Sequence, residues 1–190
     1  MNTKILSIFC MTSFSCIAFA DSLLPNYSAW YAPTDGYWGD WGAWDRCPQG
    51  QYVDGFKLKS ESYQGEGDDT GLNGISLHCN GGANVSSSVA QWGSWSNDSY
   101  CYGPAIGFAI QIESPQGDNA DDTAANNFKL ICSSGNSAYA NVQTNFGNWS
   151  QDLVCPAGQV VVGIQTRVES DQVGGDDTAL NGARLICGYR

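Results

Sequence analysis

One unit of sequence recurs three times along this 190-residue chain. Each copy contains Asp-Asp-Thr, an Asn three positions after the Thr, and a Cys at a fixed distance further on. The copies begin at Asp68, Asp121 and Asp176, so successive copies start 53 and 55 residues apart. A period this long and this regular predicts one supersecondary unit repeated three times.

Other features recur in the same order before each Asp-Asp-Thr. An aromatic-Gly-x-Trp element comes first, then a Cys, then a Gly that opens an alternating stretch ending in Glu-Ser. The aromatic elements lie at 41–44, 92–95 and 146–149, and the alternating stretches end at Glu61, Glu113 and Glu169. The repeat units are therefore predicted to cover about 38–84, 85–138 and 139–190.

The first 20 residues have the pattern of an export signal. Lys4 precedes an apolar run over 5–19, and Ala18-Phe19-Ala20 is a small-x-small cleavage sequence. The run is short for a membrane span, which needs about 20 apolar residues, and no later stretch approaches that length. We expect a signal peptide over 1–20, with bacterial rather than animal character, and one exported domain over 21–190, either secreted or periplasmic.

Six cysteines remain after the leader, in a compartment where disulfides persist. Six cysteines allow about 15 pairings, but each repeat carries one early and one late Cys. The simplest symmetric prediction is one bridge per repeat. These bridges are Cys47–Cys79, Cys101–Cys132 and Cys155–Cys187. A zinc site is the competing interpretation, and it is disfavoured because there is no Cys-x-x-Cys pair and His78 is the only histidine.

The chain is strongly acidic, with a formal net charge of −11. Phosphate binding depends on Lys and Arg, so a nucleic acid partner is not expected. Attraction to an anionic membrane is disfavoured for the same reason. We expect a monomer without a membrane span.

Alternation of apolar and polar residues dominates the chain and indicates β-strands. It is clear in Phe56–Lys59, and it recurs after each Asp-Asp-Thr, as in Ile75–Cys79. Clusters of Gly, Asn, Asp and Ser punctuate these segments as hairpin turns do. Each unit is predicted to form one sheet of about four antiparallel strands. Three such sheets can bury their apolar faces against each other as a three-sided prism, with a trefoil barrel as the alternative.

The shared motifs resemble the vitelline membrane outer layer protein I family. The resemblance covers about 38–190 and is carried by Trp-Gly-x-Trp, Cys-Pro, Asp-Asp-Thr-Ala-Leu-Asn-Gly at 176–182, and Leu-x-Cys. It implies an all-β fold: a β-prism of three Greek-key antiparallel sheets with an internal pseudo-threefold repeat, stapled by disulfides. It also implies an extracellular protein with affinity for amino-sugar glycans and a transglycosylation-like activity.

The Asp-Asp-Thr triplets have two interpretations. Asp, Thr and Asn oxygens are ligands that Ca²⁺ accepts, but adjacent Asp side chains in extended backbone point to opposite faces. In the alternative, an Asp and the Thr accept hydrogen bonds from turn N–H groups and the Asn adopts a left-handed conformation. Threefold repetition favours the turn, since a scaffold element must recur. No metal and no other cofactor is predicted.

The carboxylates also permit a glycosidase hypothesis. Glu61, Glu113 and Glu169 each precede an Asp pair by seven or eight residues, so a unit could pair a general acid with a base. Three equivalent pairs favour a structural role, however, and no catalytic residue is predicted. Whether the protein is an enzyme is left open, with binding favoured over catalysis.

Aromatic side chains give the stronger functional hypothesis, because sugar rings stack on them while polar groups satisfy the hydroxyls. Trp44, Trp95 and Trp149 recur at one unit position and are predicted to be core. The aromatics that do not recur are predicted to bind ligand: Trp30, Tyr31, Tyr37, Trp38, Trp41, Tyr100 and Tyr102.

The sequence therefore favours a secreted protein that binds polysaccharide or glycoprotein glycans through exposed aromatics and carboxylates. Two alternatives stay open. One is a glycosidase or transglycosylase acting on amino-sugar oligosaccharides, and the other is a structural extracellular coat protein without a small ligand.

Overall fold

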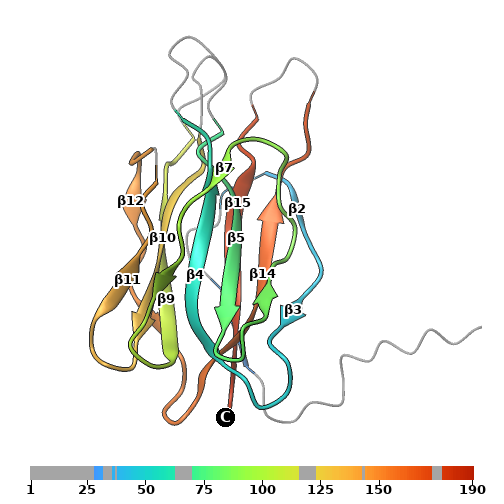
Figure 1. Cartoon of the computed structure of the whole chain (residues 1–190). Helices are drawn as coiled ribbons and strands as arrows, with labels where there is room; N and C mark the ends of the chain where they lie inside the picture. The colour runs from blue at the N-terminus through green and yellow to red at the C-terminus, as the bar shows by residue number, and fades with distance from the viewer. Residues whose placement is uncertain are drawn as a thin grey trace, which may run out of the picture.

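A computed structural model describes residues 28–31, 36, 38–62, 70–115, 123–142, 144–172 and 177–190, with side chains from residue 36 onward. The predicted signal peptide over 1–20 lies outside these residues. Within them the regular structure consists of strands alone, arranged in three sheets (Figure 1). There is no helix in these ranges long and apolar enough to cross a membrane.

A long antiparallel hairpin forms the centre of each sheet. The hairpins are β4 (Val53–Ser60) with β5 (Leu72–Cys79), β9 (Ala105–Ile112) with β10 (Ala125–Cys132), and β14 (Val160–Val168) with β15 (Leu180–Gly188). These are the alternating segments of the three repeats. We name the sheets after their first long strands: the β4 sheet, the β9 sheet and the β14 sheet.

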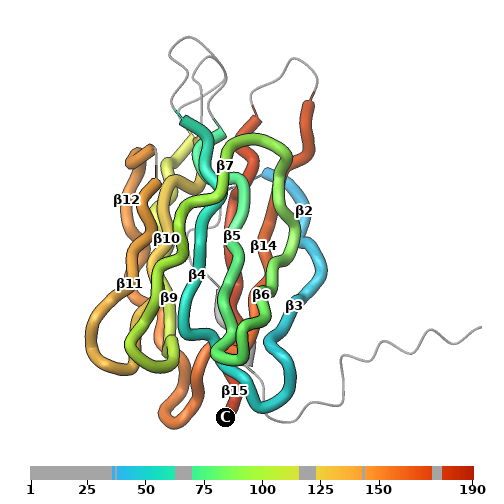
Figure 2. Tube along the Cα trace, viewed as in Figure 1, coloured from blue at the N-terminus to red at the C-terminus, as the bar shows by residue number. Residues whose placement is uncertain are grey.

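Two short strands from a neighbouring repeat complete each sheet. They are β2 (Asp40–Trp41) and β3 (Asp45–Arg46) on β14, β7 (Ser94–Trp95) and β8 (Ser99–Tyr100) on β4, and β12 (Asn148–Trp149) and β13 (Leu153–Val154) on β9. The prediction of one sheet per repeat is therefore wrong, because each sheet combines the hairpin of one repeat with the aromatic segment of the next. Figure 2 lets the chain be followed from β3, beside β14, into β4 of the adjacent sheet.

A further edge strand gives each sheet five strands. These are β6 (Asn84–Val85) beside β5, β11 (Ser137–Tyr139) beside β10, and β1 (Ser28–Tyr31) beside β15. The order β6-β5-β4-β7 is a Greek key, as is β11-β10-β9-β12. In the β14 sheet, β1 from the start of the described chain occupies the position that β6 and β11 occupy elsewhere.

The three disulfides connect the sheets in a ring. Cys47 follows β3 of the β14 sheet and bonds to Cys79 of β5, in the β4 sheet. Cys101 and Cys132 connect the β4 and β9 sheets in the same way, and Cys155 and Cys187 connect the β9 and β14 sheets. The bridges are therefore within each repeat in sequence and between sheets in space.

The core lies between the three sheets, on their inner faces. Phe56, Phe108 and Phe128 are almost fully buried, and Phe128 contacts both others with ring centroids 5.3 and 5.7 Å apart. In β4 burial alternates over 56–59, as the pattern predicts. Most of β14 is buried on both faces, because a second cluster of Val160, Val162 and Ile186 lies under Trp44 and Tyr52. These three sheets around one core form the predicted β-prism, not the trefoil alternative.

Candidate functional site: two grooves at the prism edges

Three glycines fix the position of the aromatic segment in each sheet. Gly39, Gly93 and Gly147 all have positive φ, between 73° and 78°. A Cβ on any of them would lie 2.2–2.3 Å from backbone atoms of the adjacent long strand. Only glycine fits this close approach, which sets the register of β2, β7 and β12.

This register changes which residues are equivalent in the first repeat. Trp41 pairs with Arg167, Trp95 with Lys59 and Trp149 with Gln111, so the true first copy is Trp38-Gly39-Asp40-Trp41. The alignment on 41–44 is wrong by three residues. The sequence contained the signal, since each of these tryptophans precedes its Cys by six positions. Trp44 is thus a tryptophan without a counterpart in the other repeats, whereas Trp38 and Trp41, predicted not to recur, both do.

The repeated tryptophans do not belong to the core, contrary to the prediction. Trp95 is 40 % and Trp149 38 % exposed, and Trp41 and Trp44 are partly buried. Their short strands β2, β7 and β12 lie at sheet edges, where no further strand covers the side chains. Recurrence in a pseudo-symmetric fold therefore marks an equivalent position, which can be a surface position.

A cation lies over each repeated indole. The Arg184 guanidinium is 3.5 Å from the Trp41 ring centroid, and the ammonium groups of Lys57 and Lys129 are 5.5 and 5.4 Å from those of Trp95 and Trp149. These contacts hold the rings without burying them. Lys129 also bonds Asp152 at 2.9 Å, and Tyr139 packs edge-on against Trp149 at 6.1 Å.

The glutamate of each repeat belongs to a hydrogen-bonded chain. Thr70 Oγ1 donates to Glu61 Oε2 at 2.8 Å, and Asn73 Nδ2 donates to Thr70 Oγ1 at 2.6 Å. The same chain occurs in the other repeats as Glu113–Thr123–Asn126 and Glu169–Thr178–Asn181. The repeated Glu, Thr and Asn therefore tie the end of one long strand to the start of the next.

The details of the Asp-Asp-Thr turn differ from the prediction. Each Asn is buried, and the residues with positive φ are the ones that follow the Thr: Gly71, Ala124 and Ala179. The Thr donates to a carboxylate and accepts from an amide. Asp68, Asp69, Asp121, Asp122 and Asp176 lie outside the described residues. Asp177 is buried and its Oδ1 accepts from the Gln172 N–H at 2.9 Å.

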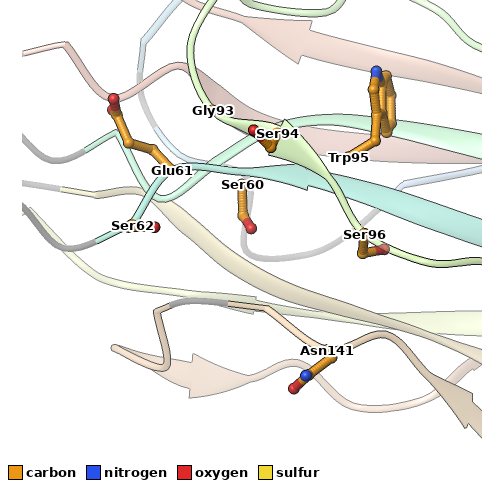
Figure 3. Close-up of a pocket in the computed structure, with 8 residues that line it drawn as sticks. All are labelled: Ser60, Glu61, Ser62, Gly93, Ser94, Trp95, Ser96 and Asn141. Carbon is orange, nitrogen blue, oxygen red and sulfur yellow. The ribbon is translucent and has the colours of Figure 1, made fainter.

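A first groove, the β4 groove, opens at the edge between the β4 and β9 sheets, with a volume of about 340 Å³ (Figure 3). It is lined by Ser60, Glu61, Ser62, Gly93, Ser94, Trp95, Ser96 and Asn141. In Figure 3 the Glu61 and Trp95 side chains rise from one side of the β4–β7 strand pair. Ser60 and Ser96 project from the other side, toward the segment that carries Asn141. The groove thus offers an indole, a carboxylate, hydroxyls and an amide.

A second groove, the β14 groove, lies at the edge between the β14 and β4 sheets, with a volume of about 400 Å³. Its lining is Asp40, Trp41, Ser88, Val89, Ala90, Gln91, Trp92, Val168, Glu169, Ser170 and Asp171. Glu169 is only 6 % exposed here, and its carboxylate accepts from the Thr178 N–H, the Thr178 hydroxyl and the Gln172 amide. Gln91 Nε2 donates across the groove to Asp171 Oδ2 at 3.0 Å.

A third polar cluster lies on the outer face of the β4 sheet. His78 Nδ1 is 2.6 Å from Asp54 Oδ1, and the Tyr100 ring packs edge-on against the imidazole at 5.1 Å. Partial desolvation, together with the Asp98 and Asp54 carboxylates, raises the pKa of Tyr100 above its ordinary value. The equivalent positions are Ile106, Ile131 and Val154 in the β9 sheet and Val162, Ile186 and Arg46 in the β14 sheet, so this cluster is specific to the β4 sheet.

The predicted aromatic residues are dispersed. Trp41 lines the β14 groove, whereas Trp38 is exposed outside both grooves. Tyr100 lies in the histidine cluster, and Tyr102 is 90 % exposed in the loop after it. Trp30 and Tyr31 are on β1, where Tyr31 pairs with Arg184, but their side chains lie outside the description, as does all of Tyr37. Sequence reasoning missed Trp95 as a groove residue and the serines that line the same groove.

The described residues do not include a cluster of side chains suited to bind a metal ion. They contain no group of three or more His, Cys, Asp or Glu side chains placed to hold an ion.

The three-sheet ring, its inter-sheet disulfides and its edge grooves define a protein of the β-prism class. Residues 28–189 match the family model of vitelline membrane outer layer protein I, and the chain belongs to that family. The human vitelline membrane outer layer protein 1 homolog is 43 % identical over 163 residues, covering 80 % of this chain and 78 % of the human protein. The mouse homolog is 38 % identical over 175 residues, covering 86 % and 85 %. These relatives are mammalian and give no support to a bacterial origin.

A solved structure confirms the architecture at low sequence identity. Calystegia sepium agglutinin is 10 % identical, with a TM-score of 0.55, and the match covers 88 % of this chain and 99 % of the agglutinin. At this identity the similarity concerns the fold alone.

Proposed function

We propose that this protein is a secreted glycan-binding protein that takes neutral and N-acetylated amino sugars of polysaccharides or glycoproteins. The observation that carries the proposal is the β4 groove. Its lining combines the exposed Trp95 indole and Glu61, on one side of the β4–β7 strand pair, with serine hydroxyls and Asn141 on the other side. Sugar rings present C–H faces that pack on an indole, and their hydroxyls need both donors and acceptors. The groove supplies each of these.

Charge supports neutral sugars over anionic ones. Neither groove is lined by Lys or Arg, and each is lined by at least one carboxylate. The whole chain carries a formal charge of −11. The cations that pack on the groove indoles, Lys57 on Trp95 and Arg184 on Trp41, are not among the lining residues. Sulfated, sialylated or uronic acid sugars would therefore meet the carboxylates of the lining and be disfavoured.

An extracellular location fits the three disulfides and the family. Bridges of this kind persist outside the cytosol, and the family takes its name from the outer layer of the vitelline membrane, which is extracellular. The periplasm, the second compartment expected from the leader, has no support in these matches. An agglutinin with the same fold is a precedent for a β-prism that serves as a binding protein.

Binding without turnover is proposed because the glutamates serve the scaffold in every repeat. Glu61, Glu113 and Glu169 each accept a hydrogen bond from the threonine of their own unit. Because the equivalent glutamate makes the same contact in all three repeats, its role is inferred to be structural. We propose the protein as a monomer with this role.

The test measures chitotetraose binding to the mature protein by titration calorimetry and tryptophan emission. We expect saturable binding with quenching, because the sugar covers exposed indoles. Trp95→Ala should weaken binding at the β4 groove by ~10–100-fold, the usual cost of removing an aromatic anchor. Its matched control is Tyr189→Ala, which removes an exposed aromatic that lines neither groove and should leave binding unchanged.

Two results would contradict the proposal. Absence of binding to chitotetraose would remove the function itself. New reducing ends after long incubation, lost in only one of Glu61→Gln, Glu113→Gln and Glu169→Gln, would show that one repeat has become an active site.

A further inference from the structure

We infer that one chain carries two glycan-binding positions, the β4 groove and the β14 groove, and therefore cross-links glycan chains as a monomer. The inference rests on the proposed function and adds the number of sites. It follows from the register of the aromatic segments, since that register makes the two grooves equivalent positions of the repeat.

The same parts build both grooves. Trp41 and Trp95 follow glycines with positive φ in β2 and β7, and both pair with the same position of a long strand. Glu169 and Glu61 follow that strand position by two residues, and each is held by the threonine of its own repeat. Each groove is therefore lined by an indole and by the carboxylate that follows a long strand.

The β14 groove differs in ways that preserve its capacity to bind. Trp92 adds a second indole, and Asp40 and Asp171 add carboxylates that accept from sugar hydroxyls. The Arg184 guanidinium at 3.5 Å fixes the Trp41 ring, which lowers the entropy lost when a ligand packs against it. The Gln91–Asp171 hydrogen bond crosses the lining, so we expect a different affinity in the two grooves.

Both grooves can be occupied together because they lie at neighbouring edges of the prism. The chain from Ser88 to Ser96 runs between them: 88–92 lines the β14 groove and 93–96 lines the β4 groove. A ligand in one groove thus contacts one half of this segment and leaves the other half free. Two sites on one rigid body convert a binder into a bridge between chains.

The experiment blocks each groove at an equivalent exposed serine. Ser62→Trp fills the β4 groove and Ser170→Trp fills the β14 groove, and both side chains start on the surface, so folding should tolerate them. The control, Ser134→Trp, places the same side chain on the exposed turn between β10 and β11. Light scattering establishes that each protein is monomeric before use.

Two readouts count the sites. Calorimetry with chitotetraose should give about two sites for the parent and the control, and about one for each blocked variant. Beads that display chitotetraose should be agglutinated by the parent and the control but by neither blocked variant, since one site cannot bridge two beads. A single site in the parent, lost completely in Ser62→Trp and unaffected by Ser170→Trp, overturns the inference and leaves the proposed function standing. No binding in the parent removes both.

Discussion

A threonine hydroxyl in each repeat links a carboxylate to a buried amide. Thr178 is the most enclosed of the three, because its partners Glu169 and Asn181 are both buried. Thr70 makes the same two bonds, but its partner Glu61 is partly exposed. Water can replace a lost hydrogen bond to Glu61 but cannot reach Glu169 as easily. The same residue triad should therefore contribute different stability in different repeats.

Thr178→Val tests this difference. Valine keeps the volume of the side chain but removes the donor to Glu169 and the acceptor for Asn181. We expect a loss of ~2–3 kcal/mol in the free energy of unfolding, measured by guanidinium denaturation. Thr70→Val is the control and should lose about 1 kcal/mol less. Equal losses would show that the exposure of the glutamate does not matter.

The sequence identified the recurring residues but not all of their roles. Cys, Glu, Thr and Asn recur at fixed positions, and the structure uses each in the same way three times. Whether a recurring Trp points into the core depends on what lies above it, which the repeat alone does not record. Trp95 lies on a two-residue edge strand and remains exposed.

At the scale of elements, the glycine before each short strand decides how the sheets are completed. Gly93 lies so close to β4 that a Cβ would be 2.3 Å from the Ser60 carbonyl oxygen. The short strand β7 can therefore approach β4 this closely only where it is preceded by glycine. This approach places Trp95 beside the end of β4 and so builds the β4 groove.

Gly93→Ala should disrupt this approach. The added Cβ combines the strain of positive φ with a collision against backbone that cannot move aside. We expect a loss of more than ~3 kcal/mol in thermal or denaturant unfolding, against about 1–2 kcal/mol for the conformational strain alone. Gly82→Ala supplies that comparison, because Gly82 also has positive φ but has no atom within 4 Å of the added Cβ. Equal losses in the two variants would remove the close approach as the cause.

The partner of each short strand could not be predicted from the repeat. The periodicity shows that a unit recurs. It is compatible with short strands that pair with the hairpin of their own repeat and with short strands that pair with the hairpin of the neighbouring repeat. The choice depends on packing around the shared core. In the structure, β7 and β8 follow β6 in the chain but pair with β4, which returns them to the first strand of the sheet.

At the scale of the molecule, the disulfides hold three sheets together that share no other covalent contact except the chain itself. The three bridges have sequence separations of 32, 31 and 32 residues, so each should constrain the unfolded chain to a similar degree. They also occupy equivalent positions in the prism. Each should therefore contribute the same stability.

Replacing one bridge by a pair of serines should lower the free energy of unfolding by ~3–4 kcal/mol, whichever bridge is chosen. The comparison is Cys155→Ser with Cys187→Ser against Cys47→Ser with Cys79→Ser, measured by guanidinium denaturation of the two variants. A much larger loss of unfolding free energy for the first pair would contradict equal contributions. It would show that the bridge between the β9 and β14 sheets matters more than the others, in the prism where β1 from the start of the described chain forms the outer strand of the β14 sheet.

The place of β1 has a consequence for the order of the chain. Because β1 stands beside β15 where β6 and β11 stand in the other sheets, the polypeptide runs once around the prism and meets itself. Ser28 is paired with Cys187, so the two ends of the described chain lie next to each other. The strand pairings would be the same if those ends were joined and the backbone opened at the turn near Gly135. The turn between β5 and β6, near Gly82, is the other equivalent opening. Circular permutants opened at either turn are therefore sequences for the same prism.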